Sequence, residues 1–339
     1  MRKPSYSLAV VGATGLVGSE IVATLEHRQF PIADLELYAS IRTAGDEVRC
    51  GGLVARVEPL EQARFADTDL AFLAAGEQVS AEWVTRLTAN GTVVIDSSRL
   101  FADDPDVPLI VPEVNPADLA QYAHRNLVSS PDPVAIAASV VLHPIHEAGV
   151  IQRVVVSSCE PVSGCGRAGI EELQRQTIEL MNGRDPEIEV FPQRIAFNIL
   201  PQVGEFLAGG ASRDERAAAS ALRRLLQAPA LALSVTRLRV PIFYGTVLAV
   251  NVETLHKLTA AAARDLLRRA PGVSLHDDVA AHAYPTPAAA VGQDAAWVGR
   301  IREDESANVL DLWVAIDNIR KGAAVNAVQI AELLIRDFL

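Results

Sequence analysis

Short apolar runs alternate with helix-like patterns through the first third of the chain. The apolar runs predict strands at Ser7–Val11, Leu35–Ala39, Leu70–Ala75 and Thr92–Asp96, with candidate edge strands at Leu109–Val111 and Leu127–Ser129. Helical periodicity between the runs predicts helices at Ser19–His27 and about Ser80–Ala89. Strands separated by helices are joined by right-handed crossovers, so this α/β pattern predicts a doubly wound parallel sheet.

The middle of the chain has a different pattern, with longer strands rich in β-branched residues. These strands are expected at Ile151–Ser158, Ala232–Val240, Thr246–Thr254 and Val309–Ala315. Helices are expected at Val134–Ala148, Gly169–Asn182, Arg213–Gln227 and Thr259–Ala270, and an amphipathic one at Gly322–Phe338. Long strands with few crossovers favour a mixed, largely antiparallel sheet covered by helices on one face.

The two patterns predict two domains and a closing helix. Residues 1–130 form the first domain, residues 131–318 form an α+β domain, and residues 319–339 form a C-terminal helix that packs back on the first domain. A chain of 339 residues is long enough for about two domains.

Charge, apolar content and cysteine count limit the partners and the cellular compartment that we expect for this protein. The 42 acidic and 30 basic side chains give a net charge of −12, and an acid excess without basic clusters argues against nucleic acid or an anionic membrane surface as a partner. No stretch reaches the roughly 18 to 20 apolar residues that span a bilayer. Three cysteines in so long a chain favour the reducing cytoplasm over a disulfide scaffold.

A glycine-rich turn follows the first predicted strand and opens the first helix. Gly12 allows the tight turn, Gly15 lets the backbone approach a pyrophosphate, and Gly18 lets helix and strand pack closely. The spacing G-x-x-G-x-x-G is a variant of the dinucleotide fingerprint, and the helix N-terminus adds free amides and a positive dipole end. A plain tight turn is the alternative. We therefore predict a Rossmann-like domain that holds a dinucleotide through Gly12, Thr14, Gly15, Leu16, Val17 and Gly18.

The end of the second predicted strand indicates which dinucleotide is bound. An NAD site usually places Asp or Glu there for the ribose hydroxyls. This strand instead ends at Ser40 and is followed by Arg42 and Thr43, while Glu36 lies within the strand. A guanidinium with neighbouring hydroxyls suits a 2′-phosphate, so NADP is favoured over NAD. A solvated loop arginine is the alternative interpretation of Arg42.

With these residues identified, the whole chain resembles the aspartate-semialdehyde dehydrogenase family. The matching segments are Gly12–Gly18, Ala39–Gly45, Asp104–Asn115, Val162–Gly164, Ile195–Asn198, Arg239–Pro241 and Asp317–Asn318. The resemblance implies a homodimer that uses NADPH to reduce aspartyl phosphate, through a cysteine thiolate that attacks the acyl group and a histidine that handles protons. It also places Ser163, Gly164 and Asn318 at the cofactor.

Two catalytic positions depart from the family's pattern. The family's Asn-Pro-Asn-Cys stretch matches Ser130–Pro133, so Pro133 stands at the nucleophile position. The proton-handling histidine, seven residues after the substrate arginine Arg239, is replaced by Thr246. Loss of members of a nucleophile–base unit typically lowers the rate by a factor on the order of 10⁴ to 10⁶. We therefore expect a pseudoenzyme, similar to the Usg-like branch of the family that lacks the catalytic cysteine.

The substrate positions are only partly retained. Arg239 matches the family's substrate arginine, whereas the family's glutamine is Glu160 in this chain. The resemblance aligns the phosphate-binding cations with Ala102 and Ala217, although Arg99 and Arg216 lie close enough in sequence to take their places. Arg239 and Glu160 are therefore the expected remnant of a site for a small carboxylate ligand.

An active NADP-dependent reductase is the alternative function. Cys165 follows Ser163-Gly164 and is a candidate replacement nucleophile, with Arg167 available to lower its pKa. Hydride transfer to a free aldehyde or ketone would need no cysteine, and Glu160 could then serve as an acid if burial raised its pKa. Packed, inert cysteines are the simpler interpretation of Cys165, Cys159 and Cys50.

A metal site is not expected. His143 and His146 are three residues apart on a predicted helix, but Pro144 lies between them and no acidic or cysteine partner is spaced nearby. The acidic cluster at Asp103, Asp104 and Asp106 contains prolines that indicate a turn.

Overall fold

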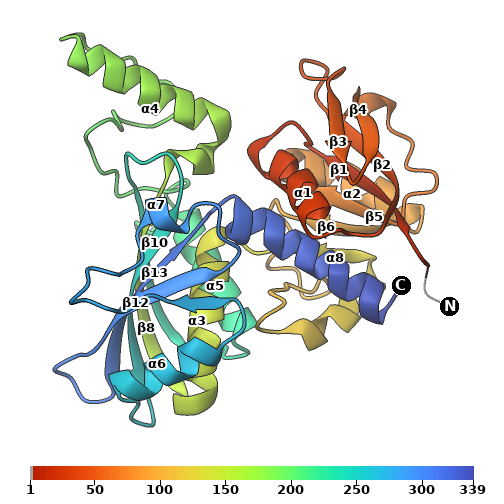
Figure 1. Cartoon of the computed structure of the whole chain (residues 1–339). Helices are drawn as coiled ribbons and strands as arrows, with labels where there is room; N and C mark the ends of the chain where they lie inside the picture. The colour runs from red at the N-terminus through yellow and green to blue at the C-terminus, as the bar shows by residue number, and fades with distance from the viewer. Residues whose placement is uncertain (1–2) are drawn as a thin grey trace. The chain divides into compact units, whose positions relative to one another are not determined.

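The computed structural model describes residues 3–339, and its contacts divide the chain into two compact units. One unit is residues 1–132 together with 323–339, and the other is residues 133–322 (Figure 1). Residues 1 and 2 of the first predicted domain lie outside the described part. No helix in residues 3–339 is both long enough and apolar enough to cross a membrane.

The first unit contains a seven-stranded sheet in the order β3-β4-β2-β1-β5-β6-β7. Every neighbouring pair is parallel except β3 and β4. The central strands are buried on both faces, which explains why they are continuous apolar runs without alternation. The strands are β1 (Tyr6–Val11), β2 (Ile32–Ala39), β3 (Glu47–Cys50), β4 (Leu53–Pro59), β5 (Leu70–Leu73), β6 (Val93–Asp96) and β7 (Leu127–Ser129).

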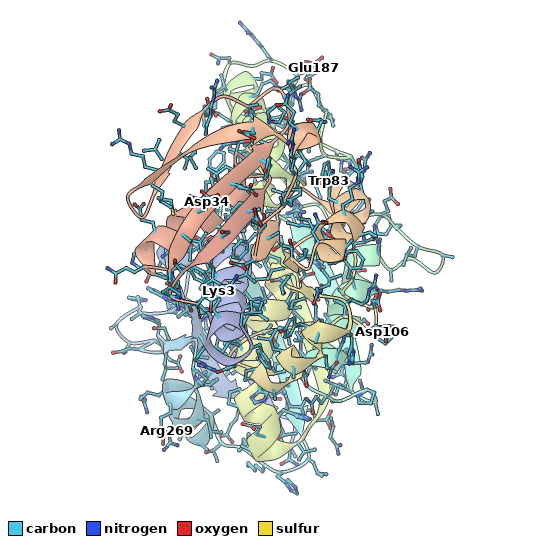
Figure 2. All side chains as sticks on the ribbon, turned by 90° about the vertical axis from the view of Figure 1, so that its right-hand side faces the viewer. Lys3, Asp34, Trp83, Asp106, Glu187 and Arg269 are labelled. Carbon is cyan, nitrogen blue, oxygen red and sulfur yellow. The ribbon has the colours of Figure 1, made fainter. Side chains whose placement is uncertain are left out.

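Helices pack against this sheet. They are α1 (Leu16–His27), α2 (Glu77–Ala89), the 3₁₀ segment η2 (Pro116–His124) and α8 (Asn326–Asp337). The end of the chain belongs to this unit because α8 packs beside α1, where the Arg28 guanidinium lies 2.7 Å from the Glu332 carboxylate. On α2, Trp83 packs edge-on against Phe65 with ring centroids 5.9 Å apart (Figure 2).

The second unit contains a six-stranded mixed sheet in the order β11-β12-β13-β10-β8-β9. The pairs β8–β9 and β11–β12 are parallel, and the other pairs are antiparallel. The predicted mixed, largely antiparallel sheet is therefore confirmed. The strands are β8 (Ile151–Glu160), β9 (Ala232–Arg239), β10 (Thr246–Thr254), β11 (Val273–Leu275), β12 (Ala296–Glu303) and β13 (Val309–Ile316).

Helices α3 (Pro133–Gly149), α5 (Arg213–Leu225) and α6 (Ala260–Arg269) cover one face of this sheet (Figure 1). Along β10, and along β8 from Val154 onward, the even-numbered residues are buried and most odd-numbered ones are more exposed. Helix α4 (Gly166–Met181) projects from the end of the sheet, and the short α7 (Pro287–Ala290) packs beside β13. A 3₁₀ turn, η3 (Val162–Cys165), precedes α4, and a π-helical turn, η4 (Arg320–Val325), leads into α8.

Two local features differ from the sequence-based expectation. The antiparallel β3–β4 pair was not predicted, although Gly51 and Gly52 mark its two-residue turn with φ values of +57° and +85°. The candidate strand Leu109–Val111 is wrong, because only Leu109 forms a bridge, to Ser129. Prolines at 108 and 112 bracket this segment and cannot donate to a ladder.

Candidate functional site

The glycine turn after β1 has the geometry of a phosphate-binding loop. Gly12 has φ +88°, and a Cβ at that position would lie 2.7 Å from the Ala74 carbonyl oxygen. A Cβ on Gly18 would lie only 2.0 Å from the Gly12 carbonyl oxygen, so helix and turn are in direct backbone contact. A Cβ on Gly15 would meet only that same oxygen, at 3.2 Å, so its outer side is open. The turn therefore offers an open backbone face at the N-terminus of α1 to a pyrophosphate.

The loop after β2 lies beside this turn. The hydroxyl oxygens of Thr14 and Thr43 are 2.9 Å apart, and the Thr43 amide donates to the Ser40 carbonyl. Arg42 is exposed in the same loop. These predicted cofactor residues are thus brought together within the first unit.

Acidic groups on β2 do not occupy the strand tip. Glu36 lies within the strand, and its carboxylate accepts a hydrogen bond from the Thr68 hydroxyl at 3.0 Å. Burial, followed by the negative charge of Glu36, raises the pKa of Tyr38 beyond its usual range. Glu36, within the strand, is therefore engaged in a hydrogen bond, and the strand end carries Ser40, Arg42 and Thr43 instead of an acidic residue.

Ser163 and Asn318, predicted from the resemblance to face the cofactor, meet in the second unit. The Asn318 amide donates to the buried Ser163 hydroxyl at 3.0 Å, and its oxygen accepts from the Gly245 amide at 2.9 Å. These bonds link the start of η3, the residue before β10 and the residues after β13.

Pro133 and Thr246 are packed residues of the second unit. Pro133 is the first residue of α3, where a missing N–H is tolerated. Its ring lies against the backbone of Gly322, because a Cβ on Gly322 would come within 2.8 Å of the Pro133 Cβ. Thr246 is buried at the start of β10 and pairs with Ile316. A proline ring and a threonine hydroxyl supply neither a thiolate nor a base at neutral pH.

Four polar side chains line one face of β8 and β9 at their parallel carboxyl ends. Ser158 is the register partner of Arg237, and Glu160 is the register partner of Arg239. Arg237 donates to both carboxylate oxygens of Glu160, from Nε at 2.6 Å and from Nη2 at 2.8 Å. The Ser158 hydroxyl donates to Glu160 as well, at 2.8 Å. Glu160 thus accepts three hydrogen bonds in a buried site and forms a bidentate pair with Arg237, an arrangement that disfavours the role of a proton donor.

Arg239 is buried and faces the turn after β8. Its Nη1 donates to the Pro161 carbonyl at 2.6 Å, and a Cβ on Gly164 would lie 2.5 Å from that nitrogen. A side chain at position 164 would therefore have to displace the Arg239 guanidinium. Within residues 3–339, no carboxylate forms an ion pair with Arg239. Arg239 is therefore a buried cation whose guanidinium donates to a backbone carbonyl.

The surroundings of the three cysteines disfavour their thiolate forms, because burial raises the pKa of each thiol. Desolvation raises the pKa of the Cys165 thiol more than the positive charge of Arg239 lowers it, and nearby carboxylates add to the rise. The net shift is therefore upward, opposite to the direction in which a neighbouring cation such as Arg167 would move it. Cys159 points to the sheet face opposite Glu160 and packs near Val247, and burial raises its pKa. Cys50 is fully buried in the first unit.

The histidine pair of α3 has a structural role. The His146 Nδ1 accepts from the Ile151 amide at 3.1 Å, and burial lowers the pKa of this imidazole. The expectation that the pair has no acidic neighbour is wrong, because the His143 Nδ1 lies 3.7 Å from the exposed Glu147 carboxylate. In the part of the chain that the structure describes, no group of three His, Cys, Asp or Glu side chains is arranged to hold a metal ion.

Arg237 is the site residue that sequence reasoning missed. It stands two positions before Arg239, on the same face of a strand, and this period-two spacing was the available signal. Its pairing with Glu160 requires knowing that β8 and β9 are neighbours, which joins residues 77 positions apart.

Comparisons with known proteins agree with this arrangement. Residues 7–122 match the family model described as "Semialdehyde dehydrogenase, NAD binding domain", and residues 142–321 match "Semialdehyde dehydrogenase, dimerisation domain". The aspartate-semialdehyde dehydrogenase of Aquifex aeolicus is 40% identical over 337 residues, which cover 98% of this chain and 99% of that protein. The crystal structure of aspartate-semialdehyde dehydrogenase II from Vibrio cholerae complexed with ASA has a TM-score of 0.97 and 39% identity, and the match covers 99% of this chain and all of that one.

Proposed function

The chain belongs to the aspartate-semialdehyde dehydrogenase family, and from that premise we propose that it is an NADP-binding homodimer without the parent activity. It would then be a member of the Usg-like branch, with the fold and cofactor site retained and the reaction lost. The observation that carries the proposal is Pro133 at the nucleophile position, packed against Gly322 at the start of α3.

Loss of the base supports the same conclusion. Thr246 is buried in the ladder between β10 and β13 and has no group that takes up a proton near neutral pH. Cys165, the remaining candidate nucleophile, has a raised pKa and is therefore a poor thiolate source. This chain would then share the fold of the relatives named as aspartate-semialdehyde dehydrogenases without catalysing the reaction of that family.

The first unit supports the choice of NADP. The open backbone at Gly15 and the amides that begin α1 would hold the pyrophosphate, and Arg42 with Ser40 and Thr43 would hold the 2′-phosphate. When bound, the reduced cofactor supplies a hydride. In this chain we expect the bound nucleotide to serve as a ligand instead.

The sheet of the second unit supports the homodimer. Its face opposite α3, α5 and α6 carries a cavity of about 550 Å³ lined mainly by apolar groups, among them Trp313, Tyr284 and Pro285. This face lies in the segment that matches the dimerisation-domain family model. A second copy of the chain that packs here would cover a broad apolar surface of the kind that obligate interfaces bury.

Calorimetric titration tests the nucleotide part of the proposal. Purified protein is titrated with NADPH and with NADH, and Arg42→Ala serves as the matched variant. We expect NADPH to bind at least about ten times more tightly than NADH, and Arg42→Ala to remove most of that difference, because each charged contact to a phosphate is worth about 1.5 to 3 kcal/mol. If NADPH does not bind at millimolar concentrations, the proposed nucleotide binding is contradicted.

A second candidate function is a reductase that acts on a carboxylate-bearing aldehyde or ketone. Arg239, a buried cation without a carboxylate partner among the described residues, is the observation that favours a small carboxylate ligand. The pairing of Glu160 with Arg237 disfavours Glu160 as the proton donor of such a reductase. Oxidation of NADPH in the presence of a panel of such aldehydes separates the two candidates.

A further inference from the structure

We propose that Arg237 is a positioning residue: by neutralising Glu160 it keeps Arg239 available for the carboxylate of a ligand. The inference rests on the proposed carboxylate site at Arg239. It concerns a departure from the family's pattern, since the resemblance places a neutral glutamine where Glu160 stands. A negative charge at that position needs a partner, and the structure determines which arginine provides it.

The register of β8 and β9 makes Arg239 the default partner of Glu160. The two residues are register partners on neighbouring parallel strands, which lie about 4.7 to 4.9 Å apart, and they are on the same face. A carboxylate and a guanidinium at that separation form a bidentate pair when nothing else intervenes. Glu160 and Arg239 are only 7% and 6% exposed, so such a pair would be weakly screened by water.

Arg237 takes that place because α5 fixes its orientation. Its Nη1 donates to the Asp214 carbonyl at 3.1 Å, and its amide donates to the Glu215 carboxylate at 3.1 Å. Glu215 is itself held in a capping box with Ser212 at the start of α5. With its backbone and guanidinium both anchored, Arg237 presents Nε and Nη2 to the two oxygens of Glu160.

The consequence is that the Arg239 guanidinium, at the turn after β8, is left without an ion-pair partner among the described residues. Glu160 and Arg237 cancel each other, and Arg239 remains with a backbone carbonyl and the Gly164 surface as its contacts. An incoming carboxylate then meets an uncompensated guanidinium. Without Arg237, Glu160 would occupy Arg239 as an internal counter-ion and would repel the ligand.

The test is a calorimetric titration at pH 7, in which succinate is the probe and NADP is present at a saturating concentration. Arg239→Met should abolish binding. Arg237→Met should weaken it at least about ten-fold, because Glu160 turns to Arg239, and the double variant Glu160→Gln/Arg237→Met should restore affinity to within about three-fold of the unmodified protein. A role limited to stability would show no such rescue.

Arg237→Gln is a second variant in case Arg237→Met does not fold. Its amide donates to Glu160 without cancelling the charge, so we expect the same direction of effect with less damage to stability.

The outcomes separate the two claims. If the unmodified protein does not bind succinate, or if Arg239→Met binds it equally well, the carboxylate site fails and the inference fails with it. If Arg239 is required but the Arg237 variants bind like the unmodified protein, or Glu160→Gln does not rescue them, only the role of Arg237 is overturned.

Discussion

At the scale of single residues, the site is defined by what surrounds each charged or nucleophilic group. Cys165 is adjacent to a cation, yet desolvation and three carboxylates outweigh it and the pKa of the thiol is raised. Arg239 is buried beside a carboxylate on the opposite strand, yet it is not paired with it, because Arg237 is. In both cases the surrounding residues determine the behaviour of the group: they raise the pKa of the Cys165 thiol and leave Arg239 without the ion pair that its position would favour.

Thiol alkylation tests the electrostatics of Cys165. Cys165 is the exposed cysteine, so iodoacetamide should label it before Cys50 and Cys159. Because only the thiolate reacts and its pKa is raised, labelling should be slow at neutral pH and should accelerate only above the usual thiol range. Arg239→Met removes the cation that lowers this pKa, so the midpoint should move to still higher pH. Rapid labelling at neutral pH would contradict the account.

At the scale of elements, the strand–turn–helix at the start of the chain offers a matched pair of substitutions. Gly18→Ala forces a Cβ to within 2.0 Å of the Gly12 carbonyl oxygen, so we expect destabilisation by about 1 to 3 kcal/mol or more. Gly15→Ala meets that oxygen at 3.2 Å and should change stability by less than about 1 kcal/mol, but its methyl group occupies the space of the pyrophosphate.

Chemical denaturation and NADPH titration of both variants check this prediction. The NADPH affinity of Gly15→Ala should fall by at least about ten-fold, while its unfolding midpoint in denaturant should stay close to that of the unmodified protein. Equal NADPH affinity in Gly15→Ala and the unmodified protein would mean that the turn is structural only.

Much of the element pattern could be predicted from the sequence, because most buried strands and amphipathic helices have strong periodicity. The glycine turn, the parallel strands β1, β2, β5 and β6, and the helices of the second unit follow from that pattern. The β3–β4 hairpin was missed because its strands are short and half-exposed, and β12 because its bulged, charged end obscures the alternation. The Arg237–Glu160 pair was beyond sequence reasoning because pairing between distant strands has no local signal.

At the scale of the whole molecule, the account predicts a dimer through the uncovered sheet face. Trp313, whose indole N–H donates to the Pro285 carbonyl at 2.9 Å, lies in the cavity of that face. Trp313→Glu places a charge there and should halve the mass that sedimentation measures. Val54→Glu, at a residue that is 61% exposed on β4, is the control and should leave the mass unchanged. A monomeric unmodified protein would contradict the proposed dimer.

The central claim is that this fold has kept its nucleotide site and lost the reaction. The most direct measurement is the formation of NADPH from NADP when the protein is mixed with aspartate semialdehyde and inorganic phosphate, with Cys165→Ser assayed in parallel. We predict no NADPH above the protein-free blank for either protein, because Pro133 and Thr246 supply neither nucleophile nor base. Turnover by the unmodified protein that disappears in Cys165→Ser would contradict the account and would identify a relocated nucleophile.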